Sequence, residues 1–392
     1  MTRTPLQSKP FDLSYAVTLA AVFISGFASA GLMVIKPLIV GALIDHYHFT
    51  PSKAGFVAGI EMAGIGIAAF IVAAFGGAWN RRLVMMTGAT IGILGSLVPI
   101  FMESYWPILV ARLLAGMGSG FIASIVLATI GTTRDPDRTF GLYYMLTYFS
   151  SALMMPAGLW AITHYAVPGG YALLAVVLAI VYVTAWRIPA APPTLIRTAG
   201  SAHLPPFPLM SSALVLGVSL CFWMGMGGVW AFVERLGGAA GMDTLDIGSV
   251  LSIGPLFSVA GAFTASVLHT RFGRFPILVA TVATGAAGTI MVGIVHQPLA
   301  YTVGVLAISY IWPMFLAYLG GAMSAIDPSG RVIAMSVTSQ TIGMAVGPAF
   351  AGVIAGRYGY EGIAVLGLVC FTATFPLMAL LHNRNRTALP AE

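Results

Sequence analysis

Three ionisable side chains lie deep inside apolar stretches of this 392-residue chain. They are Lys36, Glu61 and Arg112, and each lies eight or nine residues from the polar end of its stretch. If the stretches are helices, with a rise of about 1.5 Å per residue, all three lie roughly 12–14 Å below one surface. One carboxylate and two cations at one depth predict a buried cluster with excess positive charge.

Such a cluster suits two kinds of chemistry. Its excess charge can hold an anionic group such as a carboxylate. Alternatively, Glu61 can take up and release a proton as its pairing changes, because burial and neighbouring cations act on a carboxyl group in opposite directions. A third interpretation is a static ion pair that fixes the helices to one another. The sequence leaves all three open.

Composition places these residues in a membrane. Of the chain, 58% is hydrophobic and only 8% is charged, whereas soluble domains carry about 25% charged residues. The net charge is +6, and the basic residues lie in short loops between apolar stretches. This placement argues against a nucleic-acid partner. We therefore expect a lipid bilayer and a small-molecule substrate as partners, with no obligate protein partner, no cofactor and no metal.

Twelve apolar segments are expected, and each of the second six is near the ~20 residues that cross a ~30 Å hydrocarbon core. The first six are expected at about 13–44, 54–79, 83–102, 106–130, 139–162 and 171–186. The second six are expected at about 209–233, 247–269, 276–294, 299–322, 332–356 and 362–381. The fold class predicted is an all-α polytopic membrane protein.

The segments fall into two halves of six. Residues 187–208 hold six prolines and are expected to form a cytoplasmic linker, because proline disfavours a lipid-exposed helix. The expected organisation is therefore a tail 1–12, a first half 13–186, the linker 187–208, a second half 209–381 and a tail 382–392.

Lysine and arginine placement predicts the orientation. With the N-terminus inside, thirteen of these residues lie on the cytoplasmic side and three outside. Cytoplasmic loops carry the excess of Lys and Arg. Both termini are therefore expected in the cytoplasm, for a multi-pass protein of the cell membrane, or of the inner membrane if the source is Gram-negative.

Short motifs accompany this plan. Arg112, Gly116 and Gly118 form R-x-x-x-G-x-G in the fourth segment. Basic turns follow the second and eighth segments, and a G-x-x-x-G-P run lies in the eleventh. The motif residues are Arg81, Arg82, Arg271, Gly273, Arg274, Gly347 and Pro348.

Through these motifs, and over nearly its whole length, the chain resembles the major facilitator superfamily of secondary transporters. The resemblance implies twelve helices in two halves, a central cavity and alternating access. It ties Arg112 to proton coupling and gives the other motif residues roles in conformational change. The antiporter signature of the fifth segment is broken, because Ser151 and Met155 replace its two leading glycines.

The second half offers rings instead of charges. Five side chains there are candidates for the wall of a substrate cavity, namely Trp223, Trp230, Tyr310, Trp312 and Gln340. An aromatic wall opposite a charged wall would suit an amphipathic organic anion. Ordinary helix packing or lipid contact is the alternative for each ring.

The function expected is secondary active transport of a small organic compound, anionic or aromatic and amphipathic, by proton symport and driven by the proton gradient. The alternative is a proton antiporter that exports drugs or metabolites. An enzyme is not expected, because the buried charged set includes no obvious nucleophile. The chain has no phosphate-binding loop of the Walker type, so ATP is not expected to drive it. A sensor or scaffold with a transporter fold stays open.

Overall fold

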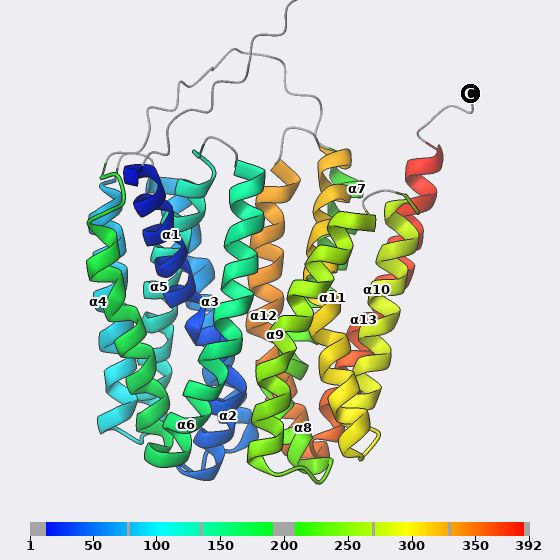
Figure 1. Ribbon diagram of the computed structural model, residues 1–392. Coiled ribbons are helices and arrows are strands. Elements are labelled where there is room, and N and C mark those ends of the chain that lie inside the picture. Colours follow the sequence, from blue (N-terminus) through cyan, green and yellow to red (C-terminus); the bar gives the residue numbers. More distant parts are fainter. Residues whose placement is uncertain are drawn as a thin grey trace, which may run out of the picture.

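The computed structural model describes residues 13–76, 79–133, 136–190, 208–268, 271–327 and 331–387. Within these ranges the chain is helical and contains no strand (Figure 1). Most of the predicted linker and both chain ends lie outside the described residues.

The helices of the first half are α1 (Leu13–Val34), α2 (Lys36–Asp45), α3 (Pro51–Phe75), α4 (Arg81–Phe101), α5 (Tyr105–Ile130) and α6 (Pro136–Ala185). Those of the second half are α7 (Leu209–Ala231), α8 (Val233–Ala239), α9 (Thr244–Leu268), α10 (Arg274–Gly293), α11 (Pro298–Ile326), α12 (Arg331–Tyr358) and α13 (Glu361–Thr387). The last helix continues past the end predicted at residue 381.

Local sequence explains where several helices begin. The Thr50 side chain accepts a hydrogen bond from the Lys53 backbone N–H, and Pro51 follows it at the first position of α3. Asn80 caps α4 by accepting from Arg82 and Leu83. Capping residues and an early proline are the usual signals of a helix start, because they satisfy or remove backbone N–H groups that lack a partner.

Helix α6 contains two of the predicted segments. Ala166 has φ 52 and ψ −145 in its middle, so the chain reverses there without a loop between regular helices. Within the described residues, eleven helical stretches are long and apolar enough to cross a membrane. The stretch Thr139–Ala185 holds both crossings of α6, which gives the expected twelve.

The two halves break their first helix at a similar place. Ile35 separates α1 from α2, and Pro37 has no N–H to donate to the backbone hydrogen bonds of a continuous helix. Phe232 interrupts α7 and α8 in the second half. The break is therefore part of the repeated plan of the halves, an arrangement known in membrane transport proteins.

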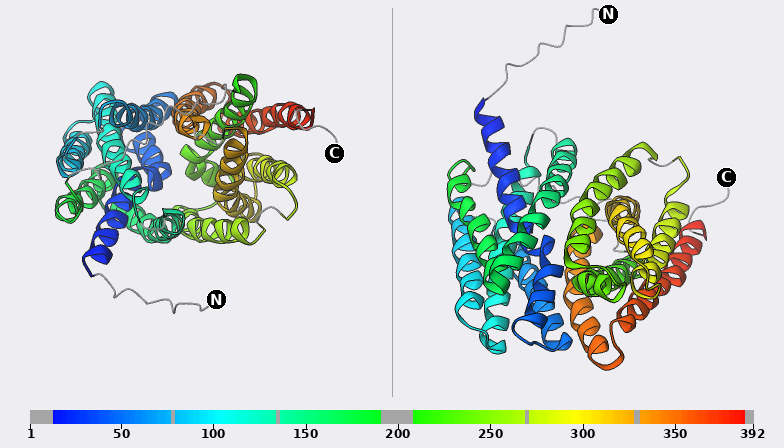
Figure 2. Two further views of the ribbon diagram at one scale, coloured as in Figure 1. Left: turned by 90° about the horizontal axis from the view of Figure 1, so that it is seen from above. Right: turned by 60° about the horizontal axis from the view of Figure 1, so that its bottom comes forward.

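The halves stand side by side, as the view from above shows (Figure 2). They meet along two seams, α3 with α12 and α6 with α9. At the first seam, a Cβ on Gly55 or Gly59 would overlap the backbone carbonyl of Pro348 or Ala345. The α3–α12 seam is thus a contact between backbones.

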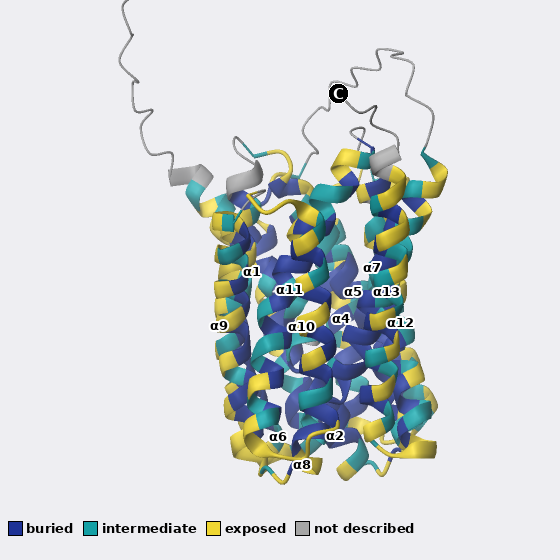
Figure 3. Ribbon diagram, turned by 90° about the vertical axis from the view of Figure 1, so that its right-hand side faces the viewer, coloured by how far each residue is buried: buried dark blue, intermediate teal, exposed yellow. Residues whose placement is uncertain are grey.

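Buried residues fill the interior, and exposed residues lie on the outer sides of the helices (Figure 3). Many of the exposed residues are large and apolar. Phe70, Val183 and Phe263 are among the exposed ones. An apolar exterior over helices of this length fits a lipid environment. We name the side where α1 begins and α13 ends the terminal face, and the other side the opposite face.

Candidate functional site

Arg112 and Glu61 form a buried ion pair in the core of the first half. The Arg112 Nε and Nη2 atoms donate to Glu61 Oε2 at 3.0 and 2.8 Å. Arg112 is 0% exposed and Glu61 is 6% exposed. The pair joins α5 to α3, two of the helices whose buried charges were predicted to lie at one depth.

Lys36 completes the predicted cluster without a direct partner. It is the first residue of α2, is 4% exposed, and interacts electrostatically with both Glu61 and Arg112. Among the described residues, neither Lys36 Nζ nor Glu61 Oε1 has a hydrogen-bond partner. Buried polar atoms are nearly always paired, so this cluster holds unused bonding capacity.

Two further side chains contact Arg112 that the sequence did not single out. The Tyr171 ring lies 4.8 Å from the guanidinium carbon, and Ser96 Oγ accepts from Nη1 at 3.4 Å. Ser96 could have been found by counting residues from the polar end of its segment. It lies seven residues before Glu103, and Arg112 lies nine residues after Glu103. Tyr171 is distant in sequence, and no spacing points to it.

The glycines after Arg112 explain how the helices come so close. A Cβ on Gly116 would overlap the backbone of Glu61 in α3, and one on Gly118 would overlap the backbone of Gly88 and Gly92 in α4. The R-x-x-x-G-x-G motif therefore gives α5 a backbone contact on each side. These glycines contact helices, which is one of the two roles that small residues serve inside membranes.

A central cavity of about 250 Å³ lies between the two halves. Its wall includes the predicted Trp230, Trp312 and Gln340. Its other lining residues are Ala30, Met33, Val34, Tyr143, Tyr144, Thr147, Tyr148, Ser151, Met155, Pro255, Ser258, Ser309 and Leu316. No Asp, Glu, Lys, Arg or His lines it among the residues that the structure describes.

The other two predicted wall residues do not line the cavity. Trp223 is buried behind it, with its ring centroid 5.2 Å from that of Trp312. The Tyr310 hydroxyl turns to α9 and donates to Thr264 Oγ1 at 2.8 Å. The first-half wall also differs from the expectation, because tyrosines of α6 stand where a charged wall was expected.

The charge cluster lies next to this cavity and not in its wall. Val34 lines the cavity, and Lys36 follows two residues later, at the break between α1 and α2. Inside the cavity, Ser309 Oγ has no hydrogen-bond partner among the described residues. Aromatic rings with a few unpaired polar atoms are typical of a small-molecule site.

The sequence was compared with models of known families. The model of the Major Facilitator Superfamily matches residues 18–329.

The chain belongs to the major facilitator superfamily.

This match, together with the helical architecture, confirms the family and fold predicted from the sequence. Members of the family are membrane transporters, not enzymes, and take small-molecule substrates across a lipid bilayer. The comparison with curated proteins gave no match.

The basic turns of this superfamily protein connect helices at the terminal face. Arg81 Nη1 donates to Thr129 Oγ1 at 3.3 Å, and its backbone N–H donates to Ala190 O at 2.9 Å. Arg82 Nε donates to Ile188 O at 2.7 Å. The predicted motif residues of α4 thus bind α5 and the chain that follows α6.

The matching turn of the second half is more open. Arg271 is exposed, and Gly273 has φ +74, a conformation that favours glycine. The Arg274 side chain lies against Gly321 of α11. In α12, Gly347 packs on the backbone of Met224 and Gly228, while the Pro348 carbonyl faces Gly55 of α3.

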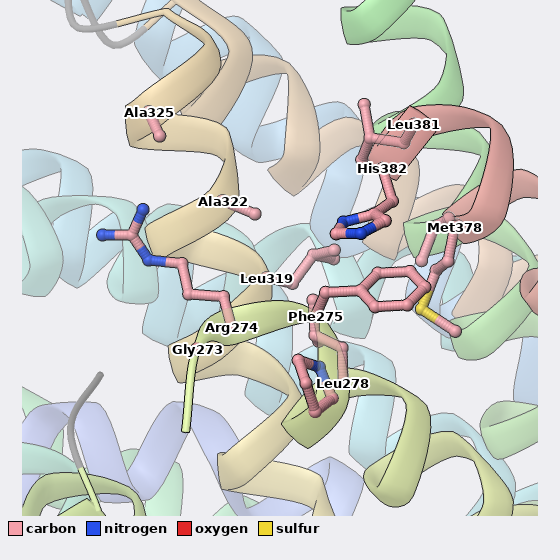
Figure 4. A pocket seen from close by; sticks show the side chains of 12 residues that line it. Gly273, Arg274, Phe275, Leu278, Leu319, Ala322, Ala325, Met378, Leu381 and His382 are labelled. Carbon is pink, nitrogen blue, oxygen red and sulfur yellow. The ribbon is translucent and has the colours of Figure 1, made fainter. Parts of the chain in front are cut away.

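A second, larger cavity of about 520 Å³ lies near the terminal face, within the second half alone. Figure 4 shows the stacked rings of Phe275 and His382, whose centroids are 4.1 Å apart, with Arg274 extending away from them. Its lining comes from helices α7, α10, α11 and α13 and from Gly273, just before α10. The smaller central cavity, in contrast, is lined by residues of both halves.

An ion cluster joins the halves at the opposite face. Arg235 of α8 donates to Gly41 O and to Asp45 Oδ2 of the first half. Its Nε lies 3.1 Å from Glu234 Oε2, close enough for an ion pair although the alignment is poor for a hydrogen bond. We call Asp45, Glu234 and Arg235 the inter-half ion cluster. It holds the halves together at this face.

Burial acts on the acid of this cluster. Desolvation raises the pKa of Glu234, Arg235 lowers it in part, and the nearby Asp45 raises it further. A raised carboxyl pKa means that the buried arrangement favours the protonated form.

Proposed function

We propose that this transporter couples the movement of protons to the movement of a small, aromatic, amphipathic organic compound by alternating access. The observation that carries the proposal is the cluster of Lys36, Glu61 and Arg112 beside the central cavity. It is buried, it contains one acid and two bases, and one oxygen and one nitrogen in it are unpaired. Such a group is a functional hypothesis by default inside a membrane protein.

The proton step follows from the pairing of Glu61. While Arg112 contacts Oε2, its guanidinium compensates the charge of the buried carboxylate. If α3 and α5 shift so that the pair separates, the carboxylate is left buried without its partner, and such a group takes up a proton. If the proton is taken up from one side of the membrane and released to the other, each cycle would move one proton across.

The substrate step follows from the cavity. Trp230 and Trp312 offer faces for an aromatic ring, and Ser309 and Gln340 offer polar contacts. Lys36 is the cluster member nearest to the wall along the chain, and its unpaired ammonium would hold a carboxylate. An anionic substrate that reaches Lys36 would weaken its hold on Glu61 and so link substrate to proton.

One observation favours a second function, proton-coupled export of an amphipathic drug or metabolite. The described cavity wall has no full charge, and a large aromatic compound without a carboxylate would also fit it. In this case the cluster serves the proton only.

The placement of Lys and Arg supports one orientation of the protein in the membrane. Placing the terminal face in the cytoplasm puts thirteen Lys and Arg residues there and three outside, as the distribution of Lys and Arg in membrane proteins favours. The inter-half ion cluster then lies on the outer side, in the plasma membrane or, in a Gram-negative bacterium, the inner membrane.

The test is proton flux in proteoliposomes that contain a pH dye, with a panel of aromatic and aliphatic carboxylates followed by amphipathic cations. We expect a carboxylate to drive proton uptake in the wild type and not in Glu61→Gln. The control is Glu361→Gln, since Glu361 is exposed and pairs only with His296 at 3.3 Å among the contacts seen. A response to cations alone would favour export, and a response unchanged by Glu61→Gln would reject the coupling site.

A further inference from the structure

Tyr171 is the largest uncharged side chain at the cluster. It lies in the second crossing of α6, is fully buried, and places its ring against the Arg112 guanidinium at 4.8 Å. A cation over an aromatic face is attracted to it, most strongly where water is excluded. The ring therefore fixes the position of Arg112.

The hydroxyl of Tyr171 has no such role in the arrangement seen. Among the described residues its Oη has no hydrogen-bond partner, although it is buried. Three groups interact with it electrostatically, namely Arg112, Glu61 and Tyr47. Arg112 is a donor only, so Glu61 is the one charged group of the three that can accept from this hydroxyl.

Glu61 Oε1 is the matching unpaired atom. It is a buried acceptor without a donor, in the same group of side chains as a buried donor without an acceptor. Two complementary atoms left over beside one ion pair indicate a contact that forms in another arrangement of the pair.

We propose that Tyr171 is a positioning residue for Glu61. Its ring holds Arg112 over Oε2, and its hydroxyl donates to the Glu61 carboxylate when that pair loosens, so that Glu61 stays ionised until the conformational change is under way. This inference rests on the proposed role of Glu61 as proton carrier. The charged and titratable groups that face Glu61 in this scheme are Arg112 from α5, Lys36 from α2 and Tyr171 from α6.

The experiment is an infrared pH titration of the purified full-length protein, which needs no substrate. The C=O stretch of a protonated carboxyl group reports Glu61, and the band is assigned by its absence in Glu61→Gln. Tyr171→Phe keeps the ring on Arg112 and removes only the hydroxyl. The matched control is Tyr182→Phe, on the same crossing of α6, whose hydroxyl bonds to Thr90 Oγ1 at 2.5 Å away from the cluster.

We expect the midpoint of the Glu61 band to move toward alkaline pH by about one pH unit in Tyr171→Phe, since the loss of a donor disfavours the ionised carboxylate. Tyr182→Phe should leave it unchanged. A wild-type midpoint in Tyr171→Phe, or an equal shift in Tyr182→Phe, overturns the role of Tyr171 while leaving Glu61 as the proton carrier. A titration without any Glu61 band overturns both proposals. Tyr171→Phe should elute from size-exclusion chromatography in detergent as the same single peak as the wild type, which shows that the variant is folded.

Discussion

Arg112 does not use its guanidinium in the usual way. Paired with a carboxylate, an arginine commonly makes two parallel bonds, one to each oxygen. Here Nε and Nη2 both contact Glu61 Oε2, and Nη1 turns to Ser96. The second carboxylate oxygen is thereby left for another donor. At the scale of single residues, the ion pair is incomplete by one bond.

The pair can be tested by its energetics. Removing one partner of a buried ion pair commonly costs about 3–5 kcal/mol, because the other charge is left alone, whereas removing both costs less. We expect Arg112→Gln and Glu61→Gln each to lower the melting temperature in detergent markedly. The double variant should recover part of the loss. Additive losses in the double variant would mean that the two side chains do not depend on each other.

Helix α5 is the element around which the first half is built. Gly116 and Gly118 are two positions apart and so lie on nearly opposite sides of the helix. One contacts the backbone of α3 and the other the backbone of α4. Close approach on both sides brings Glu61 and Ser96 within reach of Arg112. The motif glycines thus act on the site through the spacing between helices.

This explanation predicts a large effect of one methyl group. Gly116→Ala places a Cβ against the Glu61 carbonyl, which belongs to the backbone of a packed helix and has little room to move. Overpacking of this kind costs about 1–3 kcal/mol, and it should also separate Glu61 from Arg112 and abolish proton-driven transport. Gly141→Ala is the control, because nothing lies within 4 Å of a Cβ at that helical position. It should raise stability slightly or leave it unchanged.

For the helices, position and depth could be predicted from the sequence, but rotation could not. Segment positions and the common depth of Lys36, Glu61 and Arg112 follow from apolar length and helical rise, which are properties of one helix at a time. The rotation of each helix about its own axis cannot be predicted from that helix alone, because it depends on contacts with its neighbours. This is why a charged cavity wall was expected where tyrosines of α6 stand, and why Trp223 and Tyr310 were expected in a wall that they do not line.

Two further features needed the structure for the same reason. Tyr171 meets Arg112 across the bundle, at a sequence separation that no spacing rule covers. The reversal at Ala166 uses a backbone conformation that alanine rarely adopts. By contrast, the break before α2 has a signal in the sequence, the proline at position 37.

At the scale of the whole molecule, the two halves are held at the opposite face by the inter-half ion cluster. Glu234 and Arg235 belong to the second half, and Asp45 and Gly41 to the first. Tyr301 and Tyr360 are the other titratable groups that interact with Glu234. In the alternating access proposed above, opening this face to the central cavity would require these contacts to break.

The raised pKa of Glu234 gives this contact a pH dependence. In the joined arrangement the carboxyl is buried, whereas in a separated one water would return its pKa toward the ordinary value. The joined arrangement therefore binds the proton more tightly, so its stability is greatest at low pH and is lost as pH rises through the raised pKa. Raising the pH from the ordinary carboxyl pKa through the raised one should increase the separated population.

Spin labels at Ser104 and Gln297, exposed positions of different halves at this face, would measure that population by the distance between them. The background would replace Cys221 and Cys370 with serine. Glu234→Gln should remain joined across the pH range, and Asp45→Asn should separate more readily than the wild type. A pH dependence that persists in Glu234→Gln would show that another group is responsible.

The seam between α3 and α12 has a consequence for kinetics. Where helices interlock through large side chains, any relative motion must first withdraw one set of side chains from the other, and the work of doing so becomes an activation barrier. At Gly55, Gly59 and Gly352 there are no side chains to withdraw. In the alternating-access cycle proposed above, the halves would therefore rock along this line against a low barrier, and we expect the polar contacts at the faces to govern the rate of the cycle.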